Sequence, residues 1–289
     1  MAFHTTNVDQ PKFERGQLKI YLFLIPIAVI MGLPIVFIFN QSFKPLNELF
    51  AFPPRFFVEQ PTLSNFYNML SSTLSSVIPL SRYLFNSLLV TVTVLFLLVL
   101  LSTMGGYALS KMRFKGKTLL MEINTIALMF VAVAVAIPRY LLIQMLGMTD
   151  TYLAHILPLL ALPVGLFLVK QFIDTIPDAL IEAATVDGAG EWTIYCRVIL
   201  PMVRPAVMTV CILGFQLVWN NLESSNMYIN SESMKTLAFY MNTLASGNNN
   251  VAGQGVAAAA ALIMFIPNLV LFICMQKNVM STMAQSGIK

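Results

Sequence analysis

Charged side chains gather in one long polar segment of an otherwise apolar chain, residues 176–205, which we call the elbow. In and beside it, acids outnumber bases: Asp174, Asp178, Glu182, Asp187 and Glu191 against Arg197 and Arg204. An acidic, partly apolar surface suits binding to a basic groove of another protein. An interfacial helix resting on lipid headgroups is the alternative, but such a helix is expected to be basic because the lipids are anionic.

Motifs for catalysis or metal binding are missing from the sequence. Gly116-Lys117-Thr118 is similar to the end of a phosphate-binding loop, but that loop needs a glycine where Lys111 stands and a preceding buried strand. His155 has no ligand at metal spacing, the three cysteines are far apart, and neither HExxH nor GxSxG occurs. We therefore expect no enzymatic activity, no metal site and no cofactor or ATP site in this chain.

The elements that carry these residues are expected to be membrane helices. Of the 289 residues 57% are hydrophobic and only 10% are charged, whereas about a quarter are charged in soluble domains. A bilayer core takes about 20 apolar residues in a helix, and six segments meet this length, near 20–39, 84–110, 119–146, 152–170, 203–222 and 256–276. Backbone groups in hydrocarbon must pair within their own segment. We therefore predict an all-α integral membrane protein of six transmembrane helices, with the elbow between helices four and five.

Lysine and arginine predict the orientation of these helices. Roughly twelve lie on the side of the two termini and the elbow, and only Lys44, Arg55, Arg82 and Lys235 lie on the other. Both termini and the elbow are therefore expected in the cytoplasm. The net charge of +4 is interpreted as this topology signal and not as a sign of nucleic-acid binding. The domain plan is a cytoplasmic segment 1–19, a six-helix domain 20–276 and a cytoplasmic tail 277–289.

The elbow itself is expected to fold as two helices joined by a bend. Thr175 is expected to cap the first helix, whose first turn tolerates Pro177 because an N–H there has no intrahelical partner. Asp187-Gly188 supplies the bend. The second helix ends near Pro201, where the chain returns to the membrane.

Several motifs resemble those of a known family. Glu182-Ala183-Ala184, Gly188 and Ile199-Leu200-Pro201 resemble the EAA loop of permease subunits of bacterial ATP-binding-cassette importers. Gly106-Tyr107-Ala108-Leu109-Ser110 and Trp219-Asn220 are similar to further motifs of the carbohydrate-importer branch, the group of the maltose-type permeases. The resemblance covers nearly the whole chain, with the EAA loop at about 175–202.

The resemblance implies that the EAA helix docks in a cleft of a separate ATPase. Glu182 would pair with a basic residue there, Ala183 and Ala184 would allow close approach, and Asp187 and Gly188 would form the bend. It also implies four kinds of partner in or at the bacterial cytoplasmic membrane: a second permease subunit, expected to form a heterodimer with this chain, two ATPase subunits that bind ATP and Mg, an extracytoplasmic solute-binding protein, and a carbohydrate substrate.

Arg139 departs from the pattern of that family. It follows Ile137-Pro138, where an apolar residue is common, near the outer end of the third predicted helix. One interpretation is that its side chain reaches the outer headgroups. The other is that it faces the pathway and contacts a carboxylate or hydroxyl groups of an acidic sugar.

Four residues near the outer half of the fifth predicted helix are candidates for lining a sugar pathway: Gln216, Trp219, Asn220 and Asn221. Sugars bind by stacking on aromatic rings while nearby amides hydrogen-bond their hydroxyl groups. The alternative is an aromatic belt at the membrane interface with hydrogen bonds between helices. Glu223, just beyond them, is expected to contact a partner or water.

Two classes of function fit these features. The first is the membrane subunit of an ATP-driven importer that moves a sugar, in particular an oligosaccharide, by alternating access. The second is a secondary carrier driven by an ion gradient, although such carriers usually have acids within their spans, and here only Glu122 lies near the end of one. A permease of the same family for a solute other than a sugar is a further alternative.

Overall fold

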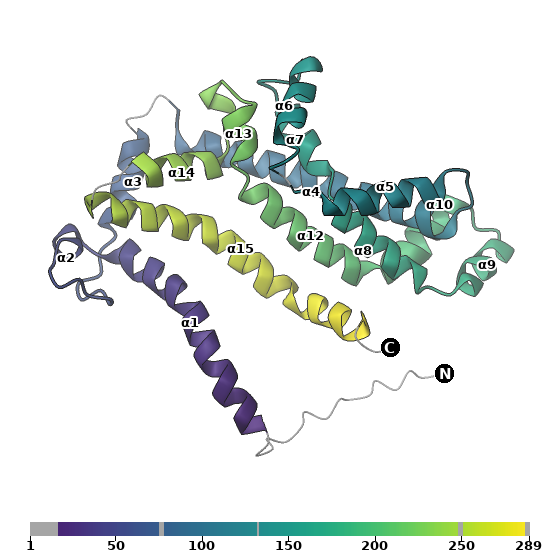
Figure 1. Cartoon of the computed structure of the whole chain (residues 1–289), viewed down its shortest axis with the longest axis horizontal. Helices are drawn as coiled ribbons and strands as arrows, with labels where there is room; N and C mark the ends of the chain where they lie inside the picture. Colours follow the sequence, from purple (N-terminus) through teal and green to yellow (C-terminus); the bar gives the residue numbers. More distant parts are fainter. Residues whose placement is uncertain (1–16, 75–77, 132, 248–250, 287–289) are drawn as a thin grey trace.

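Helices form every regular element in the part of the chain that the structure describes, residues 17–74, 78–131, 133–247 and 251–286 of a computed structural model. In chain order they are α1 (Gln17–Phe43), α2 (Leu46–Leu49), α3 (Ser64–Leu74), α4 (Leu80–Lys111), α5 (Lys117–Met129), α6 (Ala136–Met145), α7 (Tyr152–Leu160), α8 (Pro163–Asp174), α9 (Asp178–Val186), α10 (Glu191–Ile194), the π-helix η1 (Tyr195–Ile199), α11 (Leu200–Met202), α12 (Arg204–Trp219), α13 (Glu223–Met227), the 3₁₀-helix η2 (Glu232–Met234), α14 (Leu237–Gly247) and α15 (Val251–Ser286). Figure 1 shows their arrangement.

Four of these segments are long and apolar enough to cross a membrane: Ile20–Phe43, Leu80–Lys111, Arg204–Met227 and Gly253–Gln276. They correspond to the first, second, fifth and sixth predicted spans. α7 and α8 pass the same test as a pair, bent by 44° at their break, where the fourth span is predicted. The predicted all-α membrane fold is confirmed. Of the predicted terminal segments, residues 1–16 and 287–289 lie outside the described residues, and α15 continues past residue 276 to Ser286.

The third predicted span, residues 119–146, is not one helix. α5 has 13 residues and α6 has 10, so neither reaches the length of a span alone. Pro138 gives the physical reason, because proline is tolerated in the first turn of a helix, where it stands in α6, but breaks a helix interior. The count of six crossings therefore stays a prediction.

α4 is the central helix and packs closely on α8. A Cβ added at Gly106 would lie 3.0 Å from Val169 Cγ1 and 3.2 Å from the backbone nitrogen of Lys170. Only a residue without a side chain permits this approach of two backbones. The contact joins the end of α4 to the helix that leads into the elbow.

One buried cluster extends from the helix bundle into the elbow. It takes residues from α4, α8, α12 and the elbow: Leu98, Tyr107, Val169, Ile173, Ile176, Ile194, Tyr195, Ile199, Val203, Ala206 and Val210. Each of these side chains is at most 5% exposed. The elbow is therefore part of the folded core and not a loose loop.

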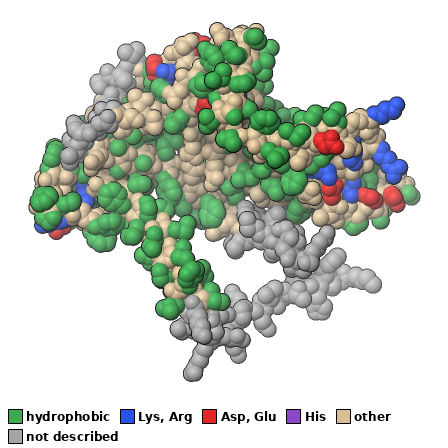
Figure 2. All heavy atoms as spheres, viewed as in Figure 1, with side chains coloured by type: hydrophobic (Ala, Val, Ile, Leu, Met, Phe, Trp, Pro, Cys, Tyr) green, Lys and Arg blue, Asp and Glu red, His purple; other side chains and the backbone are tan. Residues whose placement is uncertain are grey.

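Exposed side chains differ in kind along the molecule. α1 diverges from the bundle toward its N-terminal end (Figure 1), and most of its side chains are exposed and apolar. An apolar surface of this size suits lipid hydrocarbon. Charged side chains gather instead at the end of the molecule that carries α9 and α10 (Figure 2).

Candidate functional site

The first helix of the elbow, α9, begins at Asp178, and its N-cap residue is Pro177. The prediction that Thr175 caps this helix is wrong. Thr175 closes α8 instead, where its Oγ1 donates to the Phe172 carbonyl at 2.7 Å. Pro177 explains the difference, since the residue before a proline is disfavoured in helical conformation and so separates the two helices.

α9 ends in a bend at Gly188, as predicted. Gly188 has a φ of +80°, a conformation that side-chain-bearing residues rarely adopt. Its N–H donates to the Thr185 carbonyl at 3.0 Å, and the Ala189 N–H donates to the Ala184 carbonyl at 2.9 Å. These two bonds form the Schellman motif that terminates helices.

One face of α9 packs on the core and the other is free. Ile181 and Ala184 contact the buried cluster that extends into the elbow. Glu182, Ala183 and Asp187 are exposed. No hydrogen bond or ion pair joins Glu182 or Asp187 to a side chain in the described part of the chain, so both carboxylates are available to a partner.

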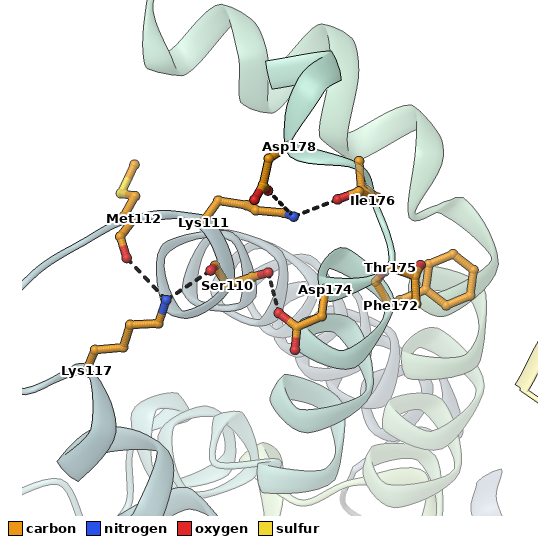
Figure 3. A network of polar contacts seen from close by, with 9 residues as sticks. All are labelled: Ser110, Lys111, Met112, Lys117, Phe172, Asp174, Thr175, Ile176 and Asp178. Atoms are coloured by element: carbon orange, nitrogen blue, oxygen red, sulfur yellow. Dashed lines mark hydrogen bonds and ion pairs between the residues drawn. The ribbon is translucent and has the colours of Figure 1, made fainter. Parts of the chain in front are cut away.

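The base of α9 is tied to the end of α4 (Figure 3). Lys111 Nζ donates to Asp178 Oδ1 and to the Ile176 carbonyl, both at 2.6 Å. Lys117, on the next helix, donates to the carbonyl of Ser110 at 2.9 Å and to that of Met112 at 3.3 Å. The loop between α4 and α5 and the start of the elbow thus form one hydrogen-bonded unit.

Asp174 makes a second connection between α4 and the elbow. Ser110 Oγ donates to its Oδ1 and Lys170 Nζ donates to its Oδ2, both at 2.5 Å. Figure 3 shows Asp174 beside the chain that leads to α9. The last turn of α8 is therefore held to the last turn of α4 by a carboxylate whose two oxygens are both occupied.

The second half of the elbow is held through tyrosines. Tyr107 on α4 donates its hydroxyl hydrogen to Glu191 Oε2 at 2.7 Å. The Tyr195 hydroxyl lies 2.7 Å from Thr103 Oγ1, and the two tyrosine rings are 6.0 Å apart. Both halves of the elbow are thus attached to α4 by hydrogen bonds.

At the other end of the molecule Arg139 pairs with Glu223. The guanidinium of Arg139, on α6, donates to Glu223 Oε1 on α13, and Tyr228 also donates to that oxygen at 3.4 Å. The structure thus gives Glu223 an intramolecular ion pair, and its side chain is still partly exposed. The two residues are 84 positions apart in the chain, so the sequence alone does not indicate that they pair.

Trp219 and Asn221 have structural contacts. Trp219 is 5% exposed, its ring stacks on Phe215 at 5.5 Å, and its Nε1 donates to the Met264 carbonyl at 3.2 Å. Asn221 Oδ1 accepts from the backbone N–H of Ser224 at 3.0 Å and from its hydroxyl at 2.6 Å. The structure gives both side chains partners within the fold.

Asn220 is exposed and lines a cavity of about 290 Å³. Its amide donates to the Gln216 carbonyl at 3.0 Å and faces the amide of Asn268 on α15. Asn242 on α14 lines the same cavity, together with alanines of α15. Sequence reasoning missed Asn242 and Asn268, although amides in apolar helices are a recognisable signal of interhelical or pathway contacts.

Residues 20–279 match the family described as binding-protein-dependent transport system inner membrane component. The inner membrane ABC transporter permease protein YcjP of Escherichia coli (strain K12) is 28% identical over 95% of this chain and 97% of its own. The arabinooligosaccharides transport system permease protein AraQ of Bacillus subtilis (strain 168) is 26% identical over 96% and 98%.

A solved structure shares the fold. It is a chain of a bacterial ABC transporter involved in the import of the acidic polysaccharide alginate. That chain matches with a TM-score of 0.78 and 21% identity, over 92% of this chain and 99% of that one.

Proposed function

Because the chain belongs to the family of binding-protein-dependent transport system inner membrane components, we propose that it is the transmembrane subunit of an ATP-driven importer for an oligosaccharide. The curated relatives are similar to it over almost their whole length, and one of them is named for arabinooligosaccharides. Membership of this family also argues against a carrier driven by an ion gradient. The transport cycle is proposed to proceed by alternating access.

Coupling to ATP is proposed to pass through the elbow. The observation that carries this proposal is a contrast along α9 and its C-cap. Glu182 and Asp187 are exposed and have no side-chain partner within the described residues, whereas Asp178 is bound to α4. Two separate ATPase subunits bind ATP and Mg, and a basic group of one of them contacts Glu182. Ala183 permits close approach at the same surface. The elbow is on the cytoplasmic side in this proposal, together with both termini.

The conformational change is proposed to reach the membrane helices through the contacts at the base of α9. When the ATPase subunits close, α9 moves as a rigid unit, because Gly188 and Pro177 end it sharply on both sides. Lys111 transmits this movement to α4. A second permease subunit completes the pathway, and an extracytoplasmic solute-binding protein delivers the sugar.

Within the pathway Asn220 is the residue best supported for contact with sugar, because its amide is exposed and lines a cavity. Gln216 lies one turn away on α12 and is likewise exposed. Trp219 and Asn221 are proposed to support this surface from within the fold. Arg139 is partly exposed and forms an ion pair with Glu223.

A reconstituted complex tests the coupling proposal. The permease, its second permease subunit and the ATPase subunits are placed in liposomes, and ATP hydrolysis is measured with and without sugar-loaded binding protein. We expect Glu182→Arg to reduce the stimulation by at least about tenfold, because a repulsion replaces a charge pair. Lys115→Glu, a charge reversal on the neighbouring exposed loop, is the control. Stimulation that is insensitive to Glu182→Arg would count against the elbow as the coupling point.

A further inference from the structure

A cavity of about 720 Å³ lies between the elbow and the loop that joins α4 to α5. Its charged lining residues are separated by sign: the α4–α5 side contributes Lys111, Arg113 and Lys117, and the elbow contributes Asp178, Glu182 and Glu191. The two sides cancel to a formal charge of zero. A ligand whose charges are complementary to the lining of this cavity carries both a positive and a negative group.

The cations of the cavity have donors to spare. A lysine ammonium has three N–H donors, and Lys111 and Lys117 each use two in the contacts described above. Arg113 is exposed and makes no hydrogen bond or ion pair within the described residues. This side of the cavity can therefore bind an anionic group such as a phosphate.

The carboxylates opposite have acceptors to spare. Tyr107 occupies only one oxygen of Glu191, and Glu182 has no partner in the described part of the chain. A carboxylate accepts hydrogen bonds and donates none when it is ionised. This side can therefore bind an ammonium group that carries N–H donors.

A second, apolar cavity of about 230 Å³ adjoins the first. Tyr107, Met112 and Glu191 line both cavities, and Met104 and Trp192 line the apolar one. The apolar cavity continues from the charged cavity along the last turns of α4, a helix that is long and apolar enough to cross a membrane. The Trp192 ring is 63% exposed, as is typical of tryptophans at the boundary between hydrocarbon and headgroups.

We propose that the two cavities bind one zwitterionic phospholipid whose headgroup ends in a primary ammonium. Its phosphate contacts Arg113 and Lys117, its ammonium contacts Glu191, and its glycerol and upper acyl chain lie beside Met104 and Trp192, while Glu182 at the rim of the cavity stays available to the ATPase. This site is additional to the proposed coupling role and does not depend on it.

The observations favour this ligand over two others. An anionic lipid would leave the carboxylates of the cavity facing a negative group. A basic side chain of a partner protein would leave Arg113 unpaired and the apolar cavity empty. A choline headgroup has no N–H to donate to Glu191, so a primary ammonium fits better.

Lipid retention tests the proposal. The assembled complex is placed in nanodiscs of phosphatidylethanolamine, phosphatidylcholine and phosphatidylglycerol in equal parts, and lipids that remain bound after mild detergent extraction are identified by native mass spectrometry. We expect phosphatidylethanolamine to be retained over the other two. Arg113→Gln and Glu191→Gln should each reduce its retention by about tenfold, since each removes a charge-assisted hydrogen bond.

The chain offers two matched controls. Lys115 lies on the same loop and Asp187 on the same elbow, both exposed and neither lining the cavity. Lys115→Gln and Asp187→Asn should leave retention unchanged. Equal retention of all three lipids, or a loss as large in the controls, would overturn the proposal. So would preferred binding of phosphatidylglycerol that is unaffected by Glu191→Gln, or a cross-link from Arg113→Cys to an ATPase subunit in the resting complex.

This experiment does not involve ATP. A complex with normal ATPase stimulation and no selective lipid retention would refute the lipid site alone. A complex that retains the lipid but is insensitive to Glu182→Arg would refute the coupling proposal alone.

Discussion

Lys111 is the last residue of α4 and Asp178 is the first residue of α9, and the Nζ of one lies 2.6 Å from the Oδ1 of the other. The side chain of Lys111 is only 11% exposed, and it also donates to the Ile176 carbonyl. Hydrogen bonds therefore join the end of a membrane helix directly to the start of the elbow, although 67 positions separate the two residues in the chain.

Removing this connection should loosen α9. Lys111→Met deletes the ion pair and leaves the Ile176 carbonyl without its donor, which we expect to weaken the attachment by about 1–2 kcal/mol. Amide hydrogen exchange in residues 178–186 should then be about 5–30-fold faster. Lys115→Met, on the same loop, should have no such effect. Unchanged exchange in Lys111→Met would show that the buried apolar face alone holds the helix.

The bend at Gly188 should depend on its backbone conformation. Gly188→Ala places a side chain at a φ of +80°, and we expect a loss of about 1 kcal/mol in stability. Thermal unfolding in detergent and ATP-driven uptake in liposomes measure the effect. Gly190→Ala is the matched control, because Gly190 has a φ of −76° and open space around it. Equal effects of the two substitutions would contradict the argument.

The contact between α4 and α8 should tolerate no side chain at Gly106. A Cβ there meets the backbone of Lys170, which cannot move alone, so we expect Gly106→Ala to destabilise the fold by about 1–3 kcal/mol. At Gly105 a Cβ meets only the flexible end of Leu166, at 3.1 Å. Thermal unfolding of both variants tests this difference, and a Gly105→Ala variant that is as unstable as Gly106→Ala would refute it.

The ion pair of Arg139 and Glu223 predicts how Arg139 acts in transport. Because its charge is already paired, we expect Arg139→Leu to reduce the uptake of neutral and acidic oligosaccharides equally. The double exchange Arg139→Glu with Glu223→Arg should restore part of the uptake. A selective loss of the acidic sugar in Arg139→Leu would support the alternative that Arg139 contacts an acidic substrate.

Asp150 should make the loop after α13 sensitive to acid. Its carboxylate accepts from the Ser231 hydroxyl at 2.6 Å and from the Ser231 N–H at 2.8 Å, and the side-chain hydrogen bond of Ser231 holds the pKa of Asp150 below its ordinary value. A carboxyl group whose folded pKa is depressed stabilises the fold fully above its unfolded pKa. That contribution is lost as the pH falls through the lower folded pKa.

Proteolysis of residues 228–236 as a function of pH measures this effect. Cleavage should rise below about pH 4, and Asp150→Asn should remove most of the pH dependence. Asp187→Asn, an exposed acid at the opposite end of the molecule, should retain it. A pH profile that is the same in Asp150→Asn as in the original protein would exclude Asp150 as the titrating group.

Local signals in the sequence were sufficient for several features. Runs of about 20 apolar residues identify the long spans, because a bilayer requires that length. Gly188 ends α9 because a positive φ at a helix end favours glycine. These features depend on a few neighbouring residues, so they can be read without knowledge of the fold.

Contacts between distant positions were decided only by the tertiary structure. Arg139 and Glu223 pair across 84 positions, and Trp219 is buried against Met264 of another helix. The helix break before Pro138 was hidden within a continuously apolar segment, where composition favours one long span. Local propensity and hydropathy act over a few turns of a helix, whereas these pairs depend on how whole helices pack. The same packing brings Lys111 to Asp178 at the base of the elbow.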